Sequence, residues 1–265
     1  MAAHPFDVLL ATCLAVSAGL YVLGVSRLWG DAGTGRGVTR AQAARFALGW
    51  ATLVAALVGP MDRWSEELFS VHMVQHELLM VVAAPLLVLG RPLQAWSWAL
   101  PEGWVLAFAR FMRRRTIAGA WHGLTEPLGA WTVHALALWA WHMPLLFEAA
   151  LHSEGIHVAQ HASFLASALC FWWAVVGRDM RAPRGAALVL VFTTMMHTSA
   201  LGALLTLAST PWYPSYAAGS AGLTGLEDQQ LGGLVMWMPG SLAYVAAALF
   251  IAYRWLARPR YRIAG

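Results

Sequence analysis

The stretch VHMVQHELLMVVAAPLLVLG, residues 71–90, has the composition of a lipid-soluble helix, except that two histidines and a glutamate lie near its start. A helix of about 20 apolar residues crosses the roughly 30 Å hydrocarbon core of a bilayer. Further apolar runs of similar length predict seven spans in all, at residues 7–29, 42–60, 68–90, 127–147, 157–177, 185–208 and 232–256. No run alternates as barrel strands do, so we expect an all-α, polytopic membrane helix bundle.

The composition supports this interpretation. Hydrophobic residues make up 59 % of the 265 residues and charged residues only 11 %, whereas an average soluble domain has about 25 % charged residues. So few charges cannot cover a water-soluble globule, and we expect a single membrane-embedded domain over residues 1–265. The start, MAAHPFD, lacks the basic region of a signal peptide, so the first apolar run is expected to be a span.

Arginines fix the expected orientation, because loops rich in basic residues stay in the cytoplasm. All 17 cationic residues are arginines, and only Arg63 falls on the other side of a seven-span arrangement. The remaining arginines form four groups on one side: Arg27, Arg36, Arg40 and Arg45; Arg91, Arg110, Arg113, Arg114 and Arg115; Arg178, Arg181 and Arg184; Arg254, Arg258, Arg260 and Arg262. This predicts an outside N-terminus and a cytoplasmic C-terminus. Because membrane orientation explains where the arginines lie, the net positive charge does not indicate that the protein binds nucleic acid.

Two long connections have unusual compositions. Residues 91–126 are apolar and rich in tryptophan, and they include the basic run RFMRRR, so we expect a cytoplasmic interfacial segment with an amphipathic helix. Residues 209–231 are rich in glycine, proline and aromatic residues, which is typical of an ordered outer loop.

Several histidines fall in one layer of this topology, at the outer ends of the expected spans. His72 and His76 are four residues apart, as are His157 and His161, so each pair shares one face of a helix. His142 ends the fourth expected span at the same level. Ionisable groups inside a membrane are costly to bury, and those that occur there usually have a function. These five histidines are therefore the candidate metal ligands.

Other residues are candidates for extra ligands or for partners that orient the ligands. They are Glu77, Asp228, Gln229, His197, Cys13 and Met73. Asp228 could instead stabilise the start of its own helix. Cys13 and Cys170 lie far apart, which does not indicate a disulfide framework. Imidazole suits several transition metals, and nearby thioethers favour Cu(I) over Zn(II).

Four blocks carry a family resemblance: HMVQHELLMVVAAPLLVLGRP, WAWHMPLLFEAALHSEGIHVAQH, PWYPSY and DQQLGGLVMWMPGSLAY. In order and spacing they resemble the seven-helix CtaG family of bacterial cytochrome c oxidase assembly factors, from about residue 60 to 250. The resemblance implies a role in maturing a haem-copper oxidase by handling copper. The matching positions are His72, His76, His142, His157, His161, Asp228 and Gln229. At Glu77 and Ala84 the chain departs from the family pattern, which often has methionine and proline there.

The expected function is therefore copper binding without catalytic turnover, in the plasma membrane of a bacterium. The expected partners are membrane lipid, subunits of a haem-copper oxidase and a copper donor protein. One alternative is a haem-bearing electron-transfer protein, in which histidines of facing helices hold the iron. A non-haem metal-dependent membrane enzyme is a further alternative, although the zinc-protease pattern HExxH is absent.

Overall fold

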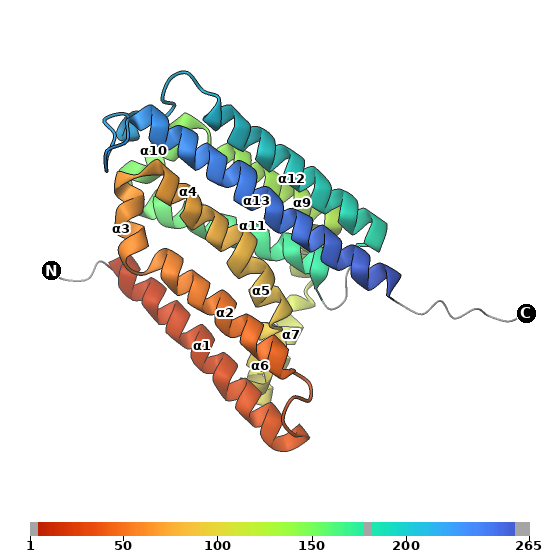
Figure 1. Ribbon diagram of the computed structural model, residues 1–265. Coiled ribbons are helices and arrows are strands. Elements are labelled where there is room, and N and C mark those ends of the chain that lie inside the picture. Colours follow the sequence, from red (N-terminus) through yellow and green to blue (C-terminus); the bar gives the residue numbers. More distant parts are fainter. Residues whose placement is uncertain (1–4, 178–181, 258–265) are drawn as a thin grey trace, which may run out of the picture.

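The computed structural model describes residues 5–177 and 182–257, and these residues form helices joined by short connections (Figure 1). The longer helices are α1 (Pro5–Ala32), α2 (Arg40–Leu57), α9 (Pro127–Trp141), α11 (Glu154–Val176), α12 (Arg184–Thr206) and α13 (Gly225–Leu256). The shorter ones are α3 (Pro60–Glu67), α4 (Phe69–Glu77), the π-helix η1 (Leu78–Ala83), α5 (Ala84–Leu89), α6 (Pro92–Ala99), α7 (Glu102–Met112), α8 (Arg115–Thr125), α10 (Pro144–His152) and the 3-10 helix η2 (Pro214–Tyr216). The all-α prediction is confirmed. Arg178, Arg181, Arg258, Arg260 and Arg262 lie outside the described residues.

Five stretches of the described chain are long and apolar enough to cross a membrane: α1, the run from α4 to α5, α11, α12 and α13. Helices α2 and α3 form a sixth candidate that bends by 46° at Val58 and Gly59. The expected span 127–147 is divided between α9 and α10, because Pro144 prevents the helix from continuing. Helix α9 has 15 residues, or about 22 Å at the α-helical rise. The protein is thus a multi-pass membrane bundle, in which a span at α9 remains a prediction.

The helices lie roughly parallel or antiparallel, with α1 and α2 on one side of the bundle and α12 and α13 on the other (Figure 1). The run from α4 to α5 and helix α11 lie between these two pairs. Helix α4 and the start of α11 carry His72 and His157, and His142 directly follows α9. We call this end of the bundle, beside α10 at the left of Figure 1, the histidine end. The opposite end, with Arg45, Arg91 and Arg184, is the arginine end. The helix ends are therefore sorted as the arginine pattern predicts.

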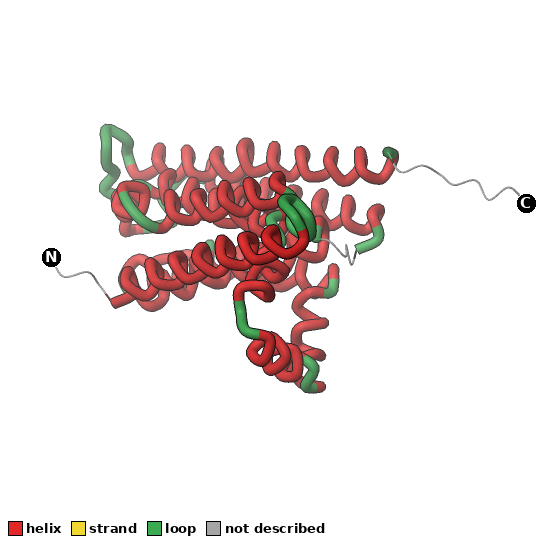
Figure 2. Tube along the Cα trace, turned by 90° about the horizontal axis from the view of Figure 1, so that it is seen from below, coloured by secondary structure: helices red, strands yellow, loops and turns green. Residues whose placement is uncertain are grey.

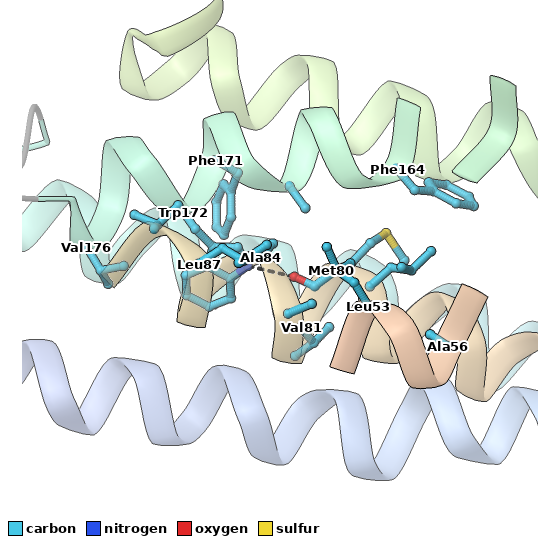
Figure 3. Close-up of a cluster of buried hydrophobic side chains, with 14 of the residues drawn as sticks. Leu53, Ala56, Met80, Val81, Ala84, Leu87, Phe164, Phe171, Trp172 and Val176 are labelled. Carbon is cyan, nitrogen blue, oxygen red and sulfur yellow. Dashed lines mark hydrogen bonds between the residues drawn. The ribbon is translucent and has the colours of Figure 1, made fainter. Parts of the chain in front are cut away.

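The span of residues 69–89 changes its winding near its middle. Pro85 has no N–H group and cannot continue a regular α-helix, and the wider π-turns of η1 come directly before it. Figure 3 shows the Trp172 indole of α11 donating a hydrogen bond to the Met80 carbonyl of η1, at 2.8 Å. Phe171 and Leu87 belong to the same buried apolar cluster. This packing fixes α11 against the helix that carries His72.

The segment of residues 91–126 forms three short helices, which stand out from the long helices in Figure 2. Helix α7 has no buried residue, as expected for an interfacial helix. Helix α6, in contrast, packs closely on α1, where a Cβ at Gly24 would lie 1.8 Å from the Ala95 carbonyl oxygen. Trp96 also donates to the Ser17 carbonyl at 3.0 Å. Part of this segment is therefore integrated into the bundle, and its place at the cytoplasmic surface remains a prediction.

The loop before α13 is ordered over the histidine end. Glu148 of α10 accepts hydrogen bonds from the backbone and side chain of Ser215, at 3.1 and 2.6 Å. The loop is shorter than expected because α13 begins at Gly225 rather than near residue 232. Thr224 and Glu227 form a capping box at this start, which stabilises the early first turn. Asp228 and Gln229 are consequently helical residues.

Candidate metal site

The structure brings together the five histidines that the sequence predicts as ligands. They form the histidine cluster: His72 and His76 of α4, His142 at the end of α9, and His157 and His161 of α11. Ring centroids are 4.4 Å apart for His72 and His76, 4.2 Å for His157 and His161, and 5.1 Å between His76 and His161. The His142 ring centroid lies farther away, at 6.1 Å from that of His76. Only His157 is half-buried, and the other four are buried.

Three of these histidines come close enough for one ion. A ligand nitrogen of His72, one of His157 and one of His161 all lie within 4.8 Å of one another. Ions bound at about 2.0 Å by three or four imidazoles place the nitrogens roughly 3.3–3.6 Å apart. Small side-chain rotations would close the difference. The arrangement is thus compatible with a three-histidine site, with His76 beside it as a further donor.

Hydrogen bonds set the orientation of two rings. The Tyr216 hydroxyl donates to the Ser65 carbonyl at 2.6 Å, so it can only accept from His72 Nδ1, which lies 3.1 Å away. His72 Nδ1 therefore carries the proton, and Nε2 presents its lone pair to the cluster. His142 is fixed in the same way, since its Nδ1 lies 2.7 Å from the Leu138 carbonyl. Such partners on the far nitrogen are typical of metal-binding histidines.

The ligand-facing nitrogens are buried without hydrogen-bond partners among the described residues. They are Nε2 of His72, His142, His157 and His161, and both ring nitrogens of His76. A buried polar atom left unpaired costs roughly 1–3 kcal/mol. Several such atoms gathered at one point are compatible with a bound ligand.

Asp228 supports this site from outside the cluster. Its carboxylate accepts the backbone N–H groups of Phe69 and Ser70, at 2.6 and 3.0 Å, and the residue is 1 % exposed. These amides belong to the first turn of α4, where N–H groups lack partners within the helix. Asp228 therefore caps the helix of His72 and His76, rather than its own helix. Gln229 likewise holds the loop, by accepting the Trp212 N–H.

Four other candidates lie away from the cluster. Glu77 and Met73 face α13, where a Cβ at Gly240 would meet Glu77 Oε2 at 2.8 Å and a Cβ at Gly232 would meet Met73 Cγ at 3.1 Å. Cys13 is exposed on α1, which packs mainly on α2 and α6. His197 lies on α12 beside Trp131, with ring centroids 5.8 Å apart.

Sequence reasoning missed several residues around the cluster. Tyr216 occurs in the block PWYPSY, but its spacing from His72 gives no sign of their contact. Burial, together with the carboxylates of Asp228, Glu148 and Glu66, raises the pKa of the Tyr216 phenol, which stays protonated at neutral pH. Phe147 and Phe164 close the cluster, with ring centroids 5.1 Å from His72 and 4.7 Å from His76, respectively.

The fold and the cluster define a multi-pass membrane protein with a buried set of histidines at one end of its bundle. Residues 19–258 match the family described as cytochrome c oxidase caa3 assembly factor, Caa3_CtaG, and the chain belongs to this family. The match confirms the resemblance and extends it over α2 and much of α1.

Curated relatives are uncharacterized proteins of mycobacteria. Those of Mycobacterium bovis and Mycobacterium tuberculosis are each 26 % identical over 235 residues, which cover 80 % of this chain and 34 % of theirs. One of Mycobacterium leprae is 26 % identical over 244 residues, covering 81 % and 34 %. The chain thus spans 34 % of the length of these relatives. No solved structure matches it.

Proposed function

We propose that the protein binds a copper ion in the histidine cluster and helps to deliver copper to a cytochrome c oxidase during assembly. The observation that carries this proposal is the approach of His72, His157 and His161 to within 4.8 Å through their ligand nitrogens. Membership of the Caa3_CtaG family supplies the link to the oxidase. In this role the ion is cargo, and the protein needs no catalytic turnover.

Cu(I) is favoured over a divalent ion by the surroundings of the cluster. The cost of burying an ion grows with the square of its charge, and an uncharged set of imidazoles compensates a monovalent ion more easily. Thioether sulfur does not contribute to this preference, because Met73 faces α13 and Met143 is 57 % exposed. The preference therefore rests on charge and on the needs of a haem-copper oxidase.

A haem group fits this arrangement poorly. A porphyrin held by two axial histidines needs a wide flat slot between them. Here Phe147 and Phe164 pack directly against His72 and His76, and their rings fill the space beside the imidazoles. The geometry supports a small ion better.

The proposed setting is the plasma membrane of a bacterium, with the histidine end outside. There the cluster could receive copper from a donor protein and pass it to oxidase subunits in the same membrane. His157 is the half-buried member, so it is the ligand that we expect an incoming ion to meet first.

Purified protein should be tested for Cu(I) binding by competition with a chromophoric chelator. We expect about one copper per chain, no haem Soret band, and loss of binding when His72→Ala and His161→Ala are combined. His152→Ala is a matched control, because this histidine is exposed at the same end and its Nδ1 bonds only to Glu148. His134→Ala controls for loss of a buried histidine outside the cluster.

The same variants should be introduced into cells, and the copper content of the mature oxidase measured. Retained copper binding by the double variant in a folded protein, or a haem spectrum in the parent, would contradict the proposal. If the oxidase acquires its normal copper content in cells that carry the double variant, copper binding by this protein is not needed for oxidase assembly.

A further inference from the structure

A second concave site lies at the arginine end, far from the histidine cluster. It is a cavity of about 840 Å³ between the first turns of α2, the end of α5, the end of α11, the start of α12 and the end of α13. The helices that meet there belong to both sides of the bundle, as Figure 1 shows for α2 and α13. This volume is within the roughly 300–1,000 Å³ range of small-molecule sites.

Arginines dominate the charge of this cavity. Arg45, Arg91, Arg184 and Arg254 line it, and none of the described lining residues is acidic. Two of them are held in place: Arg91 donates to the Gly37 carbonyl at 2.8 Å, and the Arg254 guanidinium lies 5.7 Å from the centre of the Phe250 ring. The protein thus concentrates positive charge where several helices meet.

Helix ends add to this positive potential. Helices α2 and α12 both begin at the cavity, with Arg40 and Arg184 as their first residues and no acidic residue in either first turn. The N-terminus of a helix carries partial positive charge and normally favours acidic side chains. Basic residues at two such ends oppose this preference. An anion in the cavity would offset the repulsion.

The cavity wall is not wholly polar. Val88, Leu89, Val176 and Phe250 line it beside the arginines, and each belongs to the end of an apolar helix. Helix ends of this kind lie at the level of lipid headgroups. Basic pockets between membrane helices on the cytoplasmic side suit the headgroups of anionic lipids, and guanidinium groups match phosphate through paired hydrogen bonds.

From this geometry we propose that the cavity binds the phosphate of an anionic phospholipid such as phosphatidylglycerol. Arg45, Arg184 and Arg254 contact the phosphate, and the acyl chains follow the apolar helix ends into the membrane. A bound lipid would link α2 with α12 and α13, and so stabilise the bundle at the end opposite the metal site. The proposal does not depend on copper binding.

The test uses the full chain purified in an uncharged detergent and a variant with Arg45→Gln, Arg184→Gln and Arg254→Gln. Thermal unfolding is followed while phosphatidylglycerol, phosphatidylcholine or inorganic phosphate is added, and bound lipid is counted by native mass spectrometry. Arg36→Gln, Arg110→Gln and Arg115→Gln form the matched control, since these arginines are exposed on the same predicted side and do not line the cavity.

Phosphatidylglycerol should raise the melting temperature of the wild-type protein and of the control variant, whereas phosphatidylcholine should not. The cavity variant should bind phosphatidylglycerol roughly a hundredfold more weakly, because each basic residue near a headgroup contributes about a factor of five. Equal effects of the two lipids, or equal loss in both triple variants, would overturn the site. Stabilisation by inorganic phosphate as strong as that by lipid would overturn the assignment to lipid. Without added lipid, the cavity variant and the control variant should show the same cooperative unfolding transition in detergent, which shows that the cavity variant is folded.

Discussion

The Tyr216 hydroxyl lies 3.1 Å from His72 Nδ1, although the two residues are 144 positions apart in the chain. The phenol donates to the Ser65 carbonyl, at the end of α3, and accepts from the imidazole. One loop residue therefore fixes the tautomer of a candidate ligand and connects it to the helix before α4.

Tyr216→Phe should weaken copper binding by roughly 10–100-fold, because loss of such a partner leaves the ligating ring free to turn. Tyr253→Phe, an exposed tyrosine at the arginine end, is the control. Combining Tyr216→Phe with His72→Ala should add no further loss, since both act through the same ring. Unchanged affinity in Tyr216→Phe would show that the hydrogen bond does not orient a ligand.

Replacing Asp228 should have a much larger effect than replacing Glu227, although the two residues are neighbours at the start of α13. Asp228→Ala removes both acceptors of the α4 amides, and hydrogen bonds to charged groups are worth about 1.5–3 kcal/mol each. We expect a clearly lower melting temperature, weaker copper binding and impaired oxidase maturation. Asp228→Asn keeps one acceptor oxygen and should be intermediate.

Glu227→Ala removes only the exposed carboxylate of the capping box, so binding and maturation should hardly change. Thermal unfolding, copper titration and the copper content of the oxidase check the three variants together. Equal effects of Asp228→Ala and Glu227→Ala would refute the role of Asp228 in positioning α4.

The sequence predicts the histidine cluster well because its signal is local. Spacing of four residues places His72 with His76 and His157 with His161, while hydropathy and arginines place both pairs at one end of the bundle. Glu77 and Met73 show that adjacency in the sequence does not place a side chain in the cluster. Each directly follows a histidine and is therefore turned by about 100° around the helix axis, so both face α13 instead of the cluster.

Other features depend on contacts that no local pattern reveals. The role of Asp228 involves amides about 160 residues away, which helix capping rules within one segment cannot predict. Hydropathy also does not locate helix ends: Pro144 ends α9 within an apolar run, and the capping box of Thr224 and Glu227 starts α13 before its apolar part. The sequence thus predicts which segments are helical better than where each helix ends.

Close packing of α12 and α13 gives a prediction about stability. A Cβ at Gly202 would lie 2.7 Å from the Gly233 carbonyl oxygen and 2.8 Å from the Trp237 amide nitrogen, so the backbones would have to separate. Gly202→Ala should lower the free energy of unfolding by roughly 1–3 kcal/mol, as for other overpacked sites.

Gly19→Ala is the matched control for this substitution. It lies within α1 and a Cβ there would meet nothing within 4 Å, so alanine should be neutral or slightly stabilising by helix propensity. Thermal unfolding in detergent compares the two variants. Equal melting temperatures would mean that the backbones of α12 and α13 do not approach each other closely at Gly202.

The last prediction concerns which end of the bundle faces outward. In a Cys13→Ala and Cys170→Ala background, a cysteine at Ser220 should react with a membrane-impermeant maleimide in intact cells. Ser220 lies in the loop over the histidine end, where it pairs with Leu223. A cysteine at Arg36, in the turn between α1 and α2, should react only after the cells are permeabilised. The reason is that loops rich in arginine stay in the cytoplasm. Arg36 is exposed and Ser220 is half-buried, so labelling at Ser220 alone in intact cells would report the side of the membrane, because burial would favour labelling at Arg36 instead. The reverse pattern would place the histidine cluster on the cytoplasmic side, and copper would then have to be received from inside the cell.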